Sequence, residues 1–72
     1  PNPADQDVQF TWNDQSNFTL VQLVNPLGQV VIEQDVNGMT NTTLNVSELN
    51  TGWYAVRLIS PDRIASKTLL VK

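Results

Sequence analysis

The sequence contains no cysteine and no histidine among its 72 residues. Without cysteine, neither a disulfide framework nor a cysteine-ligated metal can stabilise the chain. Without histidine, the commonest metal ligand and the commonest general base near neutral pH are both missing. These two absences exclude most designs of active site, so we expect a protein that is not an enzyme and that holds no cofactor.

Positive charge is also scarce. The formal net charge is −3, and the cations are limited to Arg57, Arg63, Lys67 and Lys72. An acidic surface repels phosphate backbones, so we expect no nucleic-acid partner. No apolar run approaches the ~20 residues that a membrane-spanning helix needs. Because hydrophobic residues make up 40% of the chain and charged residues 15%, a single soluble, folded domain over residues 1–72 is expected.

Apolar residues alternate with polar ones along much of the chain, which is typical of β-strands. Val8, Phe10 and Trp12 share one face of a first strand, and Tyr54, Val56 and Leu58 share one face of another. In residues 18–24, apolar side chains occur at both odd and even positions, so the alternation does not indicate which face of this strand is buried. Strands are predicted at residues 8–12, 18–24, 29–35, around 44–46, 53–60 and 64–71, with residues 39–43 as a loop.

Turn residues separate these strands. Asn25-Pro26-Leu27-Gly28 and Asn37-Gly38 predict hairpin turns, and residues 47–52 suit a tight turn or a single 3₁₀ turn. We expect Gly28 and Gly52 to determine the fold, with Gly52 at positive φ or in a close backbone approach, and Tyr54 to pack inward with its hydroxyl at the rim. The spacing predicts an all-β fold, a small immunoglobulin-like antiparallel sandwich of about seven strands.

Few residues suggest chemistry. The acid pairs Asp5/Asp7 and Glu33/Asp35 could each hold a hard cation, but no third acid or EF-hand-like loop accompanies them, which favours a solvated edge. Serine has no histidine to activate it. The two tryptophans, Trp12 and Trp53, suit either a sugar-stacking platform or packing, and packing in the core or on a sheet face is favoured in so small a domain. We expect no small-molecule substrate.

Four segments together resemble the C-terminal sorting domains of the type IX (Por) secretion system of Bacteroidetes-type bacteria. The resemblance covers nearly the full length, although Trp53 is bulkier than the usual residue and Gln22 interrupts the second strand. The segments are Pro1-Asn2-Pro3-Ala4, then Asn25-Pro26-Leu27-Gly28-Gln29-Val30, then Leu49-Asn50-Thr51-Gly52-Trp53-Tyr54-Ala55-Val56-Arg57-Leu58, and finally Lys67-Thr68-Leu69-Leu70-Val71-Lys72.

The resemblance implies a domain at the end of a larger cargo protein that crosses the inner membrane by a separate signal. Outer-membrane machinery would then recognise the domain. A surface sortase of the cysteine-protease type would usually remove it, leaving the cargo at the outer-membrane surface or outside the cell.

The last segment is the expected recognition signal. If its strand lies at a sheet edge, its unpaired backbone groups could accept a partner strand, with Lys67, Leu69, Leu70, Val71 and Lys72 as contact candidates. The alternative is that Leu69 and Val71 are core residues and that the lysines protect the edge against aggregation. Self-association through exposed edges stays open as well.

The sequence is also compatible with two other functions. The first is an adhesion or carbohydrate-binding module of immunoglobulin type, because a sandwich fold does not fix function. The second is an accessory domain that stabilises a neighbouring protease.

Overall fold

The computed structural model describes residues 7–72 and shows an all-β protein. The strands are β1 (Asp7–Thr11), β2 (Leu20–Val24), β3 (Val30–Asp35), β4 (Asn41–Asn45), β5 (Gly52–Ile59) and β6 (Ile64–Val71). One 3₁₀ turn, η1 (Asp14–Ser16), joins β1 to β2. The prediction of an all-β fold is confirmed, with six strands in the described residues where about seven were expected.

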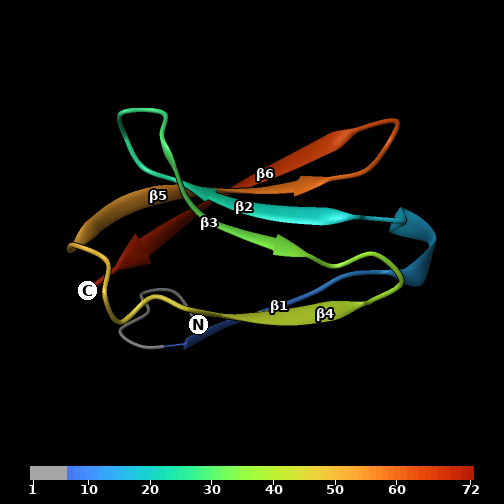
Figure 1. Ribbon diagram of the computed structural model, residues 1–72, viewed down its shortest axis with the longest axis horizontal. Coiled ribbons are helices and arrows are strands. Elements are labelled where there is room, and N and C mark those ends of the chain that lie inside the picture. Colours follow the sequence, from blue (N-terminus) through green and yellow to red (C-terminus); the bar gives the residue numbers. More distant parts are fainter. Residues whose placement is uncertain (1–6) are drawn as a thin grey trace.

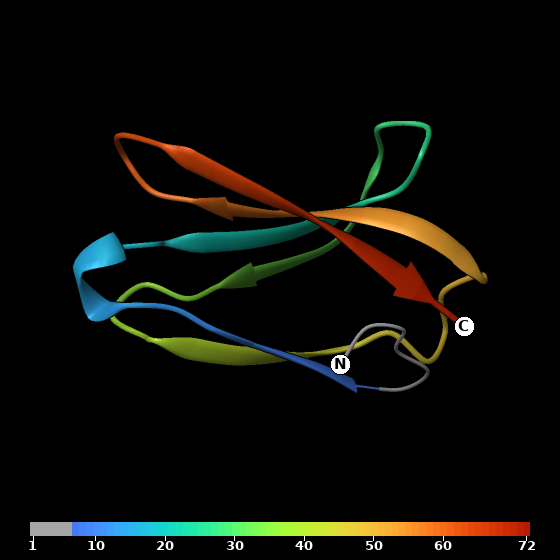
Figure 2. The ribbon, with the colours of Figure 1, turned by 180° about the vertical axis from the view of Figure 1, so that it is seen from behind.

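The strands form two antiparallel sheets that lie one above the other (Figures 1 and 2). One sheet has the order β3-β2-β5-β6, and the other pairs β1 with β4. The chain therefore crosses between the layers, since β2 and β3 intervene between the two strands of the smaller sheet. This arrangement is sandwich-like, and no helix of the described chain is long and apolar enough to cross a membrane.

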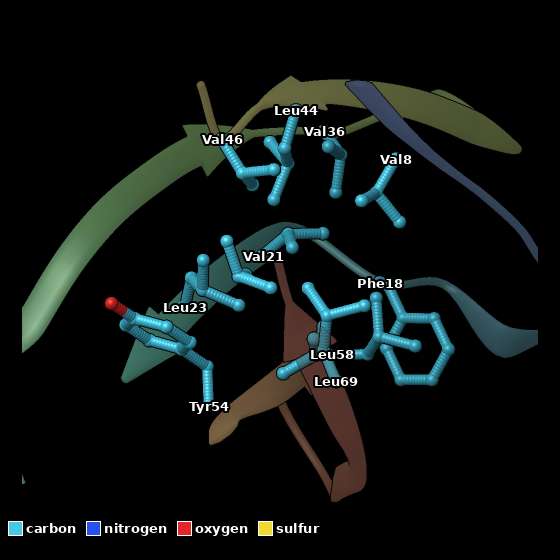
Figure 3. Packing of buried hydrophobic residues seen from close by; sticks show 12 residues of the cluster. Val8, Phe18, Val21, Leu23, Val36, Leu44, Val46, Tyr54, Leu58 and Leu69 are labelled. Atoms are coloured by element: carbon cyan, nitrogen blue, oxygen red, sulfur yellow. The ribbon is translucent and has the colours of Figure 1, made fainter. Parts of the chain in front are cut away.

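A single hydrophobic core fills the space between the sheets (Figure 3). Val21 and Leu23 of β2 are fully buried and face side chains that the smaller sheet contributes. Among the described residues, no buried side-chain nitrogen or oxygen lacks a hydrogen-bond partner. The core cluster consists of Val8, Phe18, Val21, Leu23, Val36, Leu44, Val46, Tyr54, Val56, Leu58, Leu69 and Val71.

The second strand shows why alternation could not choose its face. Val21, Leu23 and Val24 are all buried, and the register with β3 shifts between Leu23 and Val24. A regular strand directs two successive side chains to opposite faces, so this irregularity accompanies the loss of a clean period of two. The strand also begins at Leu20, two residues later than predicted.

The fourth strand corrects the prediction of a loop at residues 39–43. It spans Asn41–Asn45, and Val46 follows it. Thr42 and Leu44 point into the core opposite Phe10 and Val8 of β1. Thr and Asn gave a loop-like composition, but long-range pairing with β1 makes this segment a strand.

The turn before β3 depends on one side chain. The Asn25 Oδ1 accepts hydrogen bonds from the backbone N–H groups of Leu27 and Gln29, at 3.0 and 2.9 Å, and its Nδ2 donates to the Gln29 side chain. Gly28 has φ of 86°, a conformation that suits glycine. The predicted hairpin turn is therefore present, held by an Asx-type interaction.

Candidate functional site

The strand that carries the predicted recognition residues, β6, lies at the end of the four-stranded sheet. It pairs along its whole length with β5, from Ile59↔Ile64 to Gly52↔Val71. Its bounds match the predicted strand at residues 64–71. Recognition by strand addition requires a strand at the edge of a sheet, and β6 has this position among the described strands.

Side chains of β6 alternate between the core and the surface. Leu69 is 3% exposed and Val71 is 1% exposed, and both belong to the core cluster. Lys67 lies on the same face as these two residues, because its partner in the register is the buried Val56. Lys67 and Lys72 are exposed. The five candidate residues are therefore of three kinds: two in the core, two exposed cations, and the half-buried Leu70.

The outer face of the same sheet places Leu70 beside a tryptophan. Leu70 pairs with Trp53, which is 56% exposed, and Leu70 itself is half-buried. Trp12 behaves differently, since it packs edge-on against Phe18 with ring centroids 6.0 Å apart and donates a hydrogen bond from Nε1 to the Met39 carbonyl oxygen. The two tryptophans belong to different parts of the fold: Trp12 packs beside the core, and Trp53 lies on the outer sheet face beside Leu70.

The start of β5 contains the predicted fold-determining pair. Gly52 has φ of 152°, where a side chain would be strained. Tyr54 is 8% exposed and points inward, and its hydroxyl donates a 2.7 Å hydrogen bond to the Asn50 carbonyl oxygen. The phenol therefore ties the segment that links the two sheets to the core.

A groove runs between β1 and β6 on one side of the sandwich. Its volume is about 270 Å³, and its lining comes from three strands. The lining residues are Val8, Gln9, Phe10, Val56, Lys67, Thr68 and Leu69. Val8 and Leu69 point toward each other's sheets at this side of the core (Figure 3). Lys67, at the edge of its sheet, supplies the positive charge of this lining.

A second hollow, of about 400 Å³, lies at the end of the molecule where β6 begins. Polar and charged side chains of η1 and of the β5–β6 turn line it, including Gln15, Asp62 and Arg63. The Arg63 guanidinium lies 5.6 Å from the centre of the Phe18 ring, in cation–π range. This hollow is remote along β6 from Lys72, so it takes no part in the predicted recognition segment.

The acid pairs show no constellation for a metal. Glu33 and Asp35 both lie on exposed positions of β3, where Gln22 Nε2 donates a 2.8 Å hydrogen bond to Glu33 Oε2. Within residues 7–72 no group of three or more acidic, histidine or cysteine side chains comes together. Asp5 lies outside the described residues.

The comparison with protein families decides the identity. The family model described as Secretion system C-terminal sorting domain matches residues 1–72. The chain belongs to this family. The sorting domain is thereby assigned to type IX secretion, as the four sequence segments indicated. No curated protein and no solved structure was found to match it.

Membership of the family sets the broad role of the chain. A sorting domain of this family is a C-terminal signal for type IX secretion, interacts with that machinery, and directs a protein to the outer membrane or the extracellular space. Such a signal is not itself catalytic.

The sequence did not predict the groove of the sorting domain. The sequence nevertheless contains one indication of it. Lys67 lies on the same face of β6 as three apolar residues, Ala65, Leu69 and Val71, because all four occupy alternate positions. A single cation among the apolar residues on one face of an edge strand indicates a charge directed toward the interior side of the sheet. The position of β1 beside it could come only from the tertiary structure.

Proposed function

We propose that this sorting domain carries a larger cargo protein across the outer membrane of a Bacteroidetes-type bacterium through the type IX machinery. The cargo crosses the inner membrane first, by its own N-terminal signal. A surface sortase of the cysteine-protease type then removes the domain and links the cargo to an anionic lipopolysaccharide. Where the link is not made, the cargo is released outside the cell.

The observation that carries this proposal is the family match, which covers residues 1–72. The three motif segments that fall in the described residues coincide with features of the fold. They form the Asn25 turn, the Gly52–Tyr54 start of β5, and the edge strand β6. The motifs therefore describe a folded shape as well as a contact surface.

Recognition is assigned to the surface of β6. Lys67 and Lys72 are exposed cations on a domain whose net charge is −3, and Leu70 lies on the outer face beside the exposed Trp53. Leu69 and Val71 act from within, since their burial holds the strand in place. The position of β6 at the end of its sheet is the basis for strand addition by the machinery.

The test is an export assay. A reporter protein with an inner-membrane signal at its N-terminus and residues 1–72 at its C-terminus is expressed in a type IX-competent bacterium and in a strain without the machinery. We expect the reporter at the cell surface or in the medium of the competent strain only. A reporter that stays in the periplasm of both strains would refute the proposal.

Point variants separate recognition from folding in this assay. Deletion of residues 67–72 would remove two core side chains, so charge reversal at Lys72 is the cleaner change. We expect Lys72→Glu to reduce export, whereas Arg57→Glu, which changes the net charge equally at another exposed position, should not. Equal export by the two variants would remove Lys72 from the recognition surface. Binding of the isolated domain to glycans, without export of the reporter, would favour the adhesion function instead.

A further inference from the structure

The groove between β1 and β6 lies between an edge strand of each sheet. Each of these strands has one strand neighbour in the described structure, β4 for β1 and β5 for β6. Strands at sheet ends have backbone N–H and C=O groups directed away from their partner, and these groups can pair with an added strand. The groove of about 270 Å³ lies where such a strand would direct its inner side chains.

The chemistry of this groove is apolar with one charge. Val8, Val56 and Leu69 are each at most 3% exposed and form its floor, and Phe10 is half-buried beside them. Lys67 belongs to the register row of Leu23 and Val56, which are both buried. Among charged residues in the described strands, Lys67 alone lies in a row of inward-facing residues. The others lie in outward rows: Asp7, Glu33, Asp35 and Arg57.

We propose that this groove accepts an extended segment of the type IX machinery that carries a carboxylate between two aliphatic side chains. This inference rests on the proposed function for the identity of its partner. Successive inner positions of β6 are Ala65, Lys67 and Leu69, so an added strand sets every second side chain against them. An Asp or Glu opposite Lys67 pairs with the ammonium group, and aliphatic neighbours cover Ala65 and Leu69.

Charge complementarity argues against a second copy of this chain as the occupant. An added β6 would bring a second Lys67 into the same groove. An added β1 would offer Val8 and Phe10 on its inner face, and an added β3 would offer Ile32 and Gln34. With its faces reversed, an added β3 would offer Glu33, but between Val31 and Asp35. No described strand of this domain therefore sets a carboxylate between two aliphatic side chains, and the groove matches a partner whose strand differs from those described in this domain.

The test uses two defined peptides and the 72-residue domain, which has its own core. The first probe is the capped peptide Thr-Val-Thr-Glu-Thr-Val-Thr, and the second has Lys in place of Glu. Each is titrated into ¹⁵N-labelled domain while the amide shifts are followed by NMR. We expect the Glu peptide to shift the amides of Val8, Gln9, Phe10, Lys67 and Thr68 and to bind more tightly than the Lys peptide.

Two charge-matched variants sharpen the test. Lys67→Glu should weaken binding of the Glu peptide by about tenfold, as expected when a charge-assisted hydrogen bond becomes a like-charge contact. Arg57→Glu changes the net charge by the same amount on the opposite face of the neighbouring strand, and should alter binding by less than about twofold because the exposed charge is screened. Lys67→Gln, which removes the charge without reversing it, should abolish the preference for Glu over Lys.

Three results would overturn the inference. They are the absence of shifts at the groove with either peptide, equal binding of the two peptides by the unaltered domain, and equal weakening by Lys67→Glu and Arg57→Glu. These outcomes are independent of the export assay. A domain that exports its reporter but binds neither peptide loses the groove alone, whereas a domain that binds the Glu peptide but exports nothing loses the proposed function.

Discussion

Replacement of Tyr54 by Phe isolates one hydrogen bond in the link between the two sheets. The change keeps the aromatic ring, which is 8% exposed and belongs to the core cluster, and removes only the hydroxyl. That hydroxyl donates at 2.7 Å to the carbonyl oxygen of Asn50, in the segment between β4 and β5. The perturbation therefore tests the attachment of this segment without altering the apolar packing.

The expected loss is the net value of one partly buried hydrogen bond. Such a bond contributes about 1 kcal/mol to the free energy of unfolding. Asn50 is exposed, so water can reach its carbonyl oxygen in the variant and the penalty for an unsatisfied acceptor stays small. For a domain of this size, a loss of 1 kcal/mol lowers the midpoint of thermal unfolding by about 4–8 °C.

The assay is urea unfolding followed by tryptophan fluorescence, combined with a thermal scan by circular dichroism. Ser66→Ala is the matched control, because it also removes one hydroxyl but from an exposed position of β6, and it should change the free energy of unfolding by less than about 0.5 kcal/mol. Equal stability of Tyr54→Phe and the unaltered domain would refute the role assigned to this hydrogen bond. A loss above about 3 kcal/mol would show that the ring had moved as well.

Three further predictions use the same unfolding assay. Leu23→Ala should lower the free energy of unfolding by about 2–5 kcal/mol because the side chain is fully buried. Leu27→Ala, at an 84% exposed turn position, should lower it by less than about 0.5 kcal/mol, and similar losses in the two variants would contradict the burial of Leu23 in the core. Gly52→Ala should cost about 1–3 kcal/mol because φ is 152°, and full stability of this variant would contradict that backbone conformation. Asn25→Ala should cost about 1 kcal/mol and Asn25→Asp less, since Asp keeps the acceptor for two backbone N–H groups; an equal loss in both would exclude the acceptor role.

The hairpin of β5 and β6 was predictable because its determinants are local. Gly52 and the turn at Pro61 delimit β5, and strict alternation gave its buried face, with Tyr54, Val56 and Leu58 inside. The strand β6 begins and ends where the pattern indicated. Alternation and turn residues suffice when both partners are neighbours in sequence.

Features that depend on contacts between residues far apart in sequence could not be predicted from the alternation of apolar residues. Asn41 and Thr43 are polar, exposed residues, so composition alone did not indicate a strand here. The segment forms β4 because it pairs with β1. The sequence left open whether Trp53 packs in the core or on a sheet face, and its row in the register lies on the outer face, opposite Leu70. The groove likewise combines β1 with β6, two strands at opposite ends of the chain.

The strand order has a kinetic consequence for the sorting domain. The pair β5–β6 is a local hairpin, whereas β1–β4 and β2–β5 each join strands that lie far apart in sequence. Hairpins form in about 1–10 μs, while folds dominated by non-local pairing take milliseconds to seconds. We therefore expect the edge with Lys67 to be assembled early in folding, before the two layers close.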